Sequence, residues 1–163
     1  METTGRRHIK MAELQYDMYT TLATLYDTHD LTMPTSKAQR IGTIAETVFI
    51  KECLERDFEP HPTTTPMPWD FIVSCPAGDL KVQVKSTSVK DHNAYTVNTS
   101  TGSNMKLHMS EDVDVVAIYI SPRDEWWMMP RDVVTSKNIK LFPENPSKSK
   151  YKKYQENWSV YYE

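Results

Sequence analysis

The segment Trp69-Asp70-Phe71-Ile72-Val73 and, one turn later, the segment Lys81-Val82-Gln83-Val84-Lys85-Ser86-Thr87 have the composition of two adjacent strands. The turn chemistry of Pro76-Ala77-Gly78-Asp79 between them predicts a hairpin. Three residues in these strands are polar where burial would favour apolar side chains: Asp70, Gln83 and Lys85. These positions are therefore the first candidates for function.

The alternation of side chains along a strand groups these polar residues. Val82 and Val84 face one side of the sheet, whereas Gln83 and Lys85 face the other side together. With Asp70 from the neighbouring strand, a carboxylate, an amide oxygen and an ammonium share one small surface. Such a group can hold a divalent cation and a water molecule, which indicates a nuclease.

The length and composition of the chain limit the classes of protein to which it can belong. The 163 residues predict one domain, and the net charge of -3 gives no overall support to nucleic-acid binding. Basic clusters nevertheless occur at 6–10 and 148–154. No run is apolar enough to span a membrane, the N-terminus lacks the core of a secretory signal, and the two cysteines lack zinc or disulfide spacing. We therefore expect a cytoplasmic protein with reduced cysteines.

Helical periodicity predicts two helices before the hairpin. Apolar residues recur at helical spacing over about residues 9–26, and again over about 36–56, where Ser36 can act as the N-cap. Glu46 lies at the edge of the apolar stripe of the second helix. A connector rich in Pro and Thr, residues 60–68, leads into the first strand.

Further strands are expected after the hairpin. The polar stretch that follows Thr87 includes a possible strand at 94–98, and the nearly continuous apolar run 113–120 is typical of a central strand covered on both faces. Trp126-Trp127-Met128-Met129 predicts a neighbouring strand with one buried and one partly exposed tryptophan. A short helix is expected at 131–136, and helix in the first half of the tail. This order predicts a mixed α/β domain with a central sheet.

The chemistry of phosphodiester hydrolysis matches the polar group. The reaction needs an activated water and neutralisation of charge at the phosphate, which Mg²⁺ can supply through oxygen ligands. Asp70 and Glu46 would provide carboxylates, Gln83 only a weaker amide oxygen, and Lys85 would position the water and offset negative charge. Each residue taken singly has a simpler interpretation, as a solvated helix residue, a turn residue or a solubilising lysine. Their combination in this order carries the hypothesis.

These residues also carry a family resemblance. Gly42-x-x-x-Glu46, Pro68-Trp69-Asp70 and Val82-Gln83-Val84-Lys85-Ser86-Thr87 resemble motifs of the PD-(D/E)XK nuclease superfamily. They are similar to the branch that contains group I intron-associated homing endonucleases, in which Gln replaces the acidic residue of the last motif. Asp112 to Tyr119 resembles the following core strand, and the resemblance extends from about Ser36 to Val134.

The resemblance implies a restriction-endonuclease-like fold, a central mixed β-sheet flanked by helices, in a core over 36–146. Residues 1–35 would be a helical extension and 147–163 a basic, aromatic tail. The implied activity is site-specific double-strand cleavage of DNA with Mg²⁺, or Mn²⁺ as a substitute. The implied catalytic set is Glu46, Asp70, Gln83 and Lys85, with the first three as metal ligands. Cutting both strands favours a homodimer or homotetramer, and the cell would be bacterial or phage-infected. Gly42 would allow close approach of helix and sheet.

DNA recognition is expected in the polar stretch from Ser88 to Lys106 and in the basic tail. The candidate contacts are Ser86, Lys90, His92, Asn98, Lys106, Lys150, Lys152 and Lys153. A plain solvated loop, and a tail whose aromatic residues pack on the domain, are the alternatives. A Holliday-junction resolvase, a restriction-type nuclease of the same superfamily, and a DNA-binding module without catalysis also remain open. The neutral Gln83 favours the last of these, and the intact Glu46, Asp70 and Lys85 oppose it.

Overall fold

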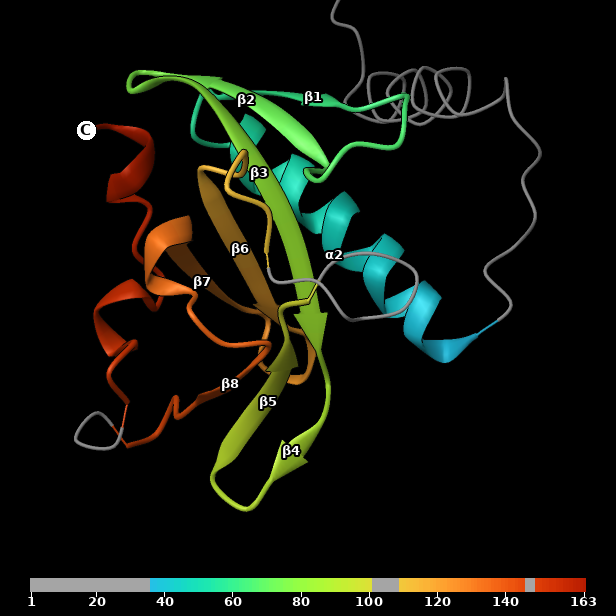
Figure 1. The fold of residues 1–163 in the computed structure, drawn as a ribbon, viewed down its shortest axis with the longest axis vertical. Coiled ribbons are helices and arrows are strands. Elements are labelled where there is room, and N and C mark those ends of the chain that lie inside the picture. Colours follow the sequence, from blue (N-terminus) through green and yellow to red (C-terminus); the bar gives the residue numbers. More distant parts are fainter. Residues whose placement is uncertain (1–35, 101–108, 146–148) are drawn as a thin grey trace, which may run out of the picture. The chain divides into compact units, whose positions relative to one another are not determined.

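The computed structural model describes residues 36–100, 109–145 and 149–163. The helix predicted over 9–26 and the candidate DNA contact Lys106 lie outside these residues. The described part is built around a five-stranded sheet with helix α2 on one face and a small second sheet on the other. Figure 1 shows this arrangement. The predicted mixed α/β class, with a central mixed sheet, is confirmed.

Helix α2 (Lys37–Leu54) begins where the sequence predicted. The Ser36 hydroxyl accepts a hydrogen bond from the Gln39 amide at 3.2 Å, and the Gln39 side chain accepts one from the Ser36 amide at 3.0 Å, forming a capping box. Ala45, Phe49 and Cys53 are buried on the face toward the sheet. This face positions Glu46, one residue beyond Ala45, at the margin of the helix–sheet contact.

The main sheet has the order β1 (Glu59–Pro62), β2 (Phe71–Cys75), β3 (Gly78–Thr87), β6 (Val115–Ile120) and β7 (Glu125–Pro130). Strands β3 and β6 are parallel, and the other neighbours are antiparallel. All six residues of β6 are buried, because both faces of this central strand are covered. The predicted hairpin and central strand are thus confirmed.

Strand β1 was not predicted. The sequence indicated a connector over 60–68, yet Glu59–Pro62 pairs with β2 from Glu59 opposite Ser74 to Pro62 opposite Phe71. Proline lacks the amide donor that a central strand needs, so Pro60 and Pro62 are compatible only with an edge position. Here β1 is that edge strand, paired on one side.

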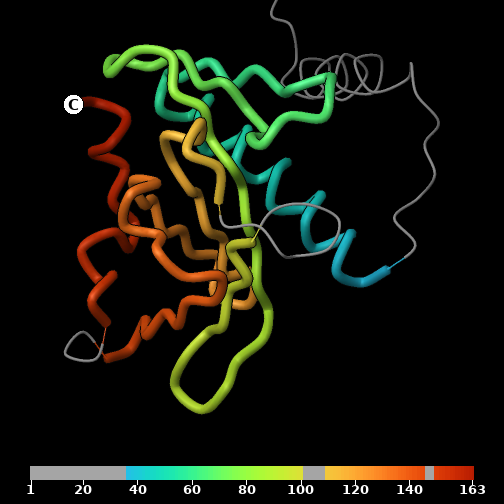
Figure 2. The backbone as a smooth tube through the Cα atoms, in the orientation of Figure 1, coloured from blue at the N-terminus to red at the C-terminus, as the bar shows by residue number. Residues whose placement is uncertain are grey.

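The second sheet consists of β4 (Lys90–Asp91), β5 (Ala94–Asn98) and β8 (Asn138–Leu141) in that order. Strand β5 was predicted and β8 was not. Tyr95, Val97, Ile139 and Leu141 face the main sheet and join a core with residues of β6 and β7. Figure 2 shows the turn between β4 and β5 projecting beyond the end of the main sheet.

Strand β7 separates two hydrophobic cores. Trp126 and Met128 belong to the core under α2, whereas Trp127 and Met129 belong to the core under the second sheet. Trp126 is 2% exposed and Trp127 is 0% exposed, so the predicted partial exposure of one tryptophan is wrong. Side chains alternate between the two faces of a strand, and both faces of β7 are covered. The two adjacent tryptophans are therefore buried on opposite faces of the strand.

The C-terminal segment packs into these same cores. Tyr151 lies in the core under the second sheet, and Trp158 and Tyr161 lie in the core under α2. Its helical residues form 3₁₀ turns, η4 (Lys152–Tyr154) and η5 (Ser159–Tyr161), in place of the predicted helix. Two further 3₁₀ turns flank β7, η1 (Ser121–Arg123) and η2 (Arg131–Val133), the second within the predicted helix 131–136.

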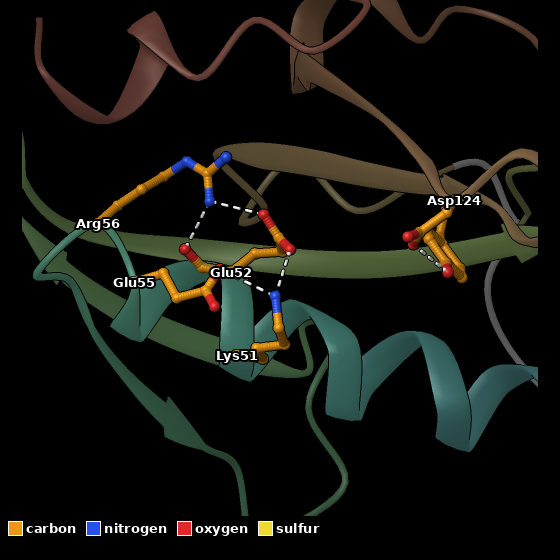
Figure 3. Close-up of polar contacts among 6 residues, drawn as sticks. Lys51, Glu52, Glu55, Arg56 and Asp124 are labelled. Atoms are coloured by element: carbon orange, nitrogen blue, oxygen red, sulfur yellow. Dashed lines mark hydrogen bonds and ion pairs between the residues drawn. The ribbon is translucent and has the colours of Figure 1, made fainter.

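Charged side chains at the end of α2 pair with one another, and one of them also contacts this C-terminal segment. Lys51 pairs with Glu55 at 2.8 Å, and Arg56 pairs with Glu52 at 2.7 Å (Figure 3). The Arg56 guanidinium also lies 4.1 Å from the centre of the Trp158 ring, a cation–π contact. The end of the helix is therefore a structural junction, separate from the polar group on β3.

Two smaller expectations meet a direct test. An added Cβ at Gly42 would meet no atom within 4 Å, so this glycine does not serve close approach of helix and sheet. Cys53 is buried and Cys75 half-buried, and both are free thiols. Among the described residues, no helix combines the length and the apolar character needed to cross a membrane.

Candidate active site

Asp70 lies where β2 and β3 separate. The strand pairing ends at Phe71 opposite Val82, and the Asp70 amide still donates to the Val82 carbonyl at 2.9 Å. One step further, the Asp70 carboxylate accepts a hydrogen bond from the Val84 amide at 2.8 Å. The side chain thus takes the place that a strand carbonyl would occupy. This geometry fixes the carboxylate at the point where the sheet opens.

Gln83 holds the same carboxylate from β3. Its amide nitrogen donates to Asp70 Oδ2 and also to the Val84 carbonyl oxygen at 3.1 Å. Gln83 is only 8% exposed, so these bonds satisfy a buried polar group. The structure thus brings Asp70 and Gln83 together, with the Gln83 amide nitrogen as a donor to the carboxylate.

Lys85 lies two residues further along the same face of β3, half-buried. Its ammonium donates to the Ser100 carbonyl oxygen at 3.3 Å. Burial lowers the Lys85 pKa from its ordinary value, and the charge of Asp70 partly opposes this effect. A lysine with a lowered pKa gives up its proton more readily, which suits a group that helps to deprotonate water.

Burial shifts the pKa of Asp70 in the opposite direction from that of Lys85. It raises the Asp70 pKa, while the Val84 amide, the Lys85 charge and the Gln83 amide favour the charged form and limit the rise. Three separate groups thus stabilise one carboxylate at this position. The charges of Asp70 and Lys85 each favour the charged form of the other group.

Glu46 reaches the group from α2. Burial of its carboxyl group, and next the nearby charge of Asp70, raise the Glu46 pKa to about 7. The residue as a whole is exposed on the helix, so water screens part of this effect, and its direction is what we use. The two carboxylates repel each other, and a bound cation would relieve that repulsion.

The donor set fits a hard divalent cation. Mg²⁺ is commonly bound by one or two carboxylates and keeps several water ligands. Glu46 and Asp70 supply two carboxylates, and the Gln83 amide could add a neutral oxygen. Within 36–100, 109–145 and 149–163, His, Cys, Asp and Glu form no group of three that could hold a metal ion. Glu46 and Asp70 are thus the two carboxylates of this group that could hold a divalent cation.

Comparison with known families decides the family of the chain. The family model for the PD-(D/E)XK endonuclease matches residues 36–161, most of the chain. This chain belongs to the PD-(D/E)XK endonuclease family. The resemblance found in the sequence is confirmed, and the match extends past Val134 through the C-terminal segment.

A solved structure shares the fold of this family member. A bacterial homing endonuclease, I-Ssp6803I, superposes with a TM-score of 0.67 at 19% sequence identity. The comparison covers 78% of this chain and 93% of the other. A search of curated proteins gives no match. The structural likeness confirms the restriction-endonuclease-like fold class.

The residues predicted to contact DNA differ in their exposure to solvent. Lys90 and His92 are exposed on β4 and its turn, Asn98 is exposed at the end of β5, and Ser86 is half-buried. In the tail, Lys150 and Lys153 are exposed, and their ammonium groups lie over Tyr151 and Tyr154.

Lys152 has a different environment. It is half-buried, and its ammonium donates to the Pro143 carbonyl oxygen at 2.7 Å. This contact ties η4 to the loop after β8. The structure therefore gives Lys152 a packing role, and leaves Lys150 and Lys153 as the described tail lysines with exposed side chains.

Thr99 and Ser100 lie within the stretch from Ser88 to Lys106, for which the sequence predicted DNA recognition, and their burial near Lys85 was not predicted. Both are buried polar residues at the end of β5, and Ser100 supplies the acceptor for Lys85. They belong to a stretch rich in Ser, Thr and Asn, and the sequence pattern of this stretch does not distinguish buried residues from solvated ones. Thr99 and Ser100 are buried because strand β5 runs back toward β3, a feature of the fold that the local sequence does not indicate.

Proposed function

We propose that this chain is a site-specific, Mg²⁺-dependent DNA endonuclease of the homing type that makes double-strand breaks. The observation that carries the proposal is the Asp70 carboxylate, held by the Val84 and Gln83 amides and electrostatically coupled to both Lys85 and Glu46. Family membership and the fold shared with a homing endonuclease support it.

The residues divide the work of hydrolysis. Asp70 and Glu46 would hold the cation, with the Gln83 amide oxygen as a neutral third donor. The bound cation supplies Lewis-acid stabilisation of charge at the phosphate and lowers the pKa of water. Lys85 orients the attacking water and offsets negative charge near the phosphorus. Gln83 also fixes the carboxylate without adding a third negative charge.

Double-stranded DNA requires two such sites for a double-strand break. One small domain presents one site, so two copies related by a two-fold axis would address the two strands. A homodimer or a homotetramer is the corresponding assembly. The protein would act in the cytoplasm of a bacterial or phage-infected cell.

Cleavage of a library of duplex targets tests this function. With Mg²⁺ or Mn²⁺, the parent protein should cut one long site, and mapping of the ends gives its position. Asp70→Asn and Lys85→Ala should each lower the cleavage rate roughly 100-fold or more, since each removes a group that acts on the reacting atoms. EDTA should abolish cleavage.

Matched controls come from exposed residues of the same types. Asp132→Asn removes an exposed carboxylate on η2, and Lys51→Ala removes an exposed lysine of α2, so both should cut like the parent. Parental rates for Asp70→Asn and Lys85→Ala would refute the assignment. Cleavage of four-way junctions without sequence preference would instead identify a resolvase, and tight binding without cleavage a non-catalytic module.

A further inference from the structure

The position of the Lys85 charge depends on a backbone carbonyl group. A lysine side chain carries its ammonium on a flexible four-carbon stem, so a fixed acceptor decides where that charge lies. The Ser100 carbonyl oxygen is such an acceptor, 3.3 Å from the Lys85 ammonium. Whatever fixes Ser100 therefore bears on the geometry of Lys85.

Thr99 ties this segment to the backbone that precedes β8. Its amide donates to the Lys137 carbonyl at 2.8 Å, and its hydroxyl donates to the Ser136 carbonyl at 2.6 Å. Thr99 is 1% exposed, so neither bond competes with bulk water. The bonds continue the pairing of β5 with β8 one residue past Asn98 opposite Asn138.

Asn98 closes a turn over the same residue. Its side-chain oxygen accepts hydrogen bonds from the Ser100 amide, at 2.9 Å, and from the Ser100 hydroxyl. An Asn side chain that bonds to the amide two residues later is a typical turn-forming arrangement. This turn and the tether at Thr99 hold the Ser100 amide and hydroxyl, and thus the backbone from which the Ser100 carbonyl projects.

We propose that Thr99 is a positioning residue whose bonds to the Ser136 and Lys137 carbonyl groups hold the Ser100 carbonyl oxygen, and through it the Lys85 ammonium, beside Asp70. The consequence for catalysis rests on the proposed function, whereas the positioning does not. Loss of the Thr99 hydroxyl should displace Lys85, and a displacement of this kind lowers the rate of the chemical step more than the affinity for DNA.

Nuclear magnetic resonance of lysine side chains tests the positioning without any nuclease activity. In protein labelled at the lysine Cε and Nζ atoms, the Lys85 signal is assigned by its loss in Lys85→Arg. Thr99→Val should shift or broaden this signal, and Thr99→Ser, which keeps a hydroxyl, should restore it. If Thr99→Val does not fold, Asn98→Ala replaces it, since it removes the turn over Ser100.

Thr87→Val is the matched control. The Thr87 hydroxyl is also buried, donates to a β5 carbonyl group, that of Thr96, at 2.7 Å, and accepts a hydrogen bond from the Val89 amide at 3.1 Å; neither bond involves Ser100. This variant should lose stability to a similar extent as Thr99→Val but keep the Lys85 signal. A Lys85 signal unchanged in Thr99→Val, or changed equally in Thr87→Val, would overturn the proposal.

Cleavage kinetics then connect the positioning to function. With a cleaved duplex target and saturating protein, Thr99→Val should lower the single-turnover rate roughly 10-fold or more, while the Kd for DNA changes less than about 2-fold. A rate loss that appears only as weaker binding would contradict the positioning role. If the parent cuts no DNA, the proposed function fails, and the Lys85 signal still decides the inference about Thr99.

Discussion

Gln83 stabilises Asp70 as a neutral donor. The buried amide of Gln83 donates to the Asp70 carboxylate, which burial already makes harder to ionise. Glutamate at this position would remove the donor and place a second carboxylate against the first. The neutral residue therefore lets two carboxylates, Asp70 and Glu46, share the site without a third.

We expect Gln83→Glu to lower the free energy of unfolding by about 1–3 kcal/mol without divalent cations, because a buried hydrogen bond is replaced by like-charge repulsion. Mg²⁺ should recover part of this loss. Thermal unfolding with EDTA and with Mg²⁺ measures both effects. Gln39→Glu is the control, since glutamate fits the exposed capping box equally well. Equal stability of Gln83→Glu and the parent in EDTA would contradict the donor role.

Glu46 gives the site a pH dependence. Its pKa in the folded protein is raised to about 7, above its unfolded value near 4.5. The unfolded chain therefore loses this proton first, and the contribution to stability is full below pH 4.5 and lost as the pH rises through 7. In EDTA, the difference in Tm between Glu46→Gln and the parent should grow over that range and then level off.

The control for this titration is Glu55→Gln, which changes an exposed carboxylate at the end of the same helix. Its Tm difference from the parent gives the background for the loss of one exposed carboxylate of this helix. Because Glu46 is exposed as a residue, solvent screening makes the effect modest, and its sign is the decisive observation. A Tm difference for Glu46→Gln that stays constant with pH would show that Asp70 and burial do not act on Glu46.

Two glycines show how element geometry sets the sign of a substitution. Gly78 begins β3 with φ at +111°, a conformation that other residues rarely adopt, whereas Gly42 lies within α2. A Cβ would meet nothing within 4 Å at either position, so packing cannot decide the outcome. Backbone conformation alone decides it.

Gly42→Ala should therefore stabilise the protein by about 0.5–1 kcal/mol, the gain of alanine over glycine in a helix. Gly78→Ala should destabilise it by about 1–3 kcal/mol through backbone strain. Urea unfolding of the two variants and the parent measures both changes, and each variant serves as the control for the other. Changes of the same sign would show that local packing, and not conformation, controls these sites.

Elements with a local signal were predictable, and elements that depend on a partner were not. The capped helix after Ser36 and the alternation at Gln83 and Lys85 depend only on residues that are close in the sequence. Strand β1 contains two prolines and β8 lies in polar sequence, so each is a strand only because another strand pairs with it. The acceptor of Lys85 follows the same rule, since Ser100 reaches β3 through the return of β5.

At the scale of the molecule, a chain of net charge -3 must bind a polyanion through local positive charge. Lys153 is exposed with its ammonium over Tyr154, while the Lys152 ammonium is bonded to the Pro143 carbonyl. Of these two adjacent lysines, Lys153 contributes positive charge to the surface, whereas Lys152 contributes to packing. If the tail contacts phosphates, Lys153 releases a counterion from DNA and Lys152 does not.

We expect Lys153→Ala to weaken DNA binding and to lower the slope of log Kd against log salt concentration by about 1, the value for one phosphate contact. Lys152→Ala should keep the parental slope and instead lower the Tm, because it loses the bond to the loop after β8. Fluorescence anisotropy with a labelled duplex in EDTA, over a series of KCl concentrations, measures the slopes without cleavage. Identical slopes for Lys153→Ala and the parent would remove Lys153 from the DNA surface, and would shift the search to Lys90 on the projecting β4 strand.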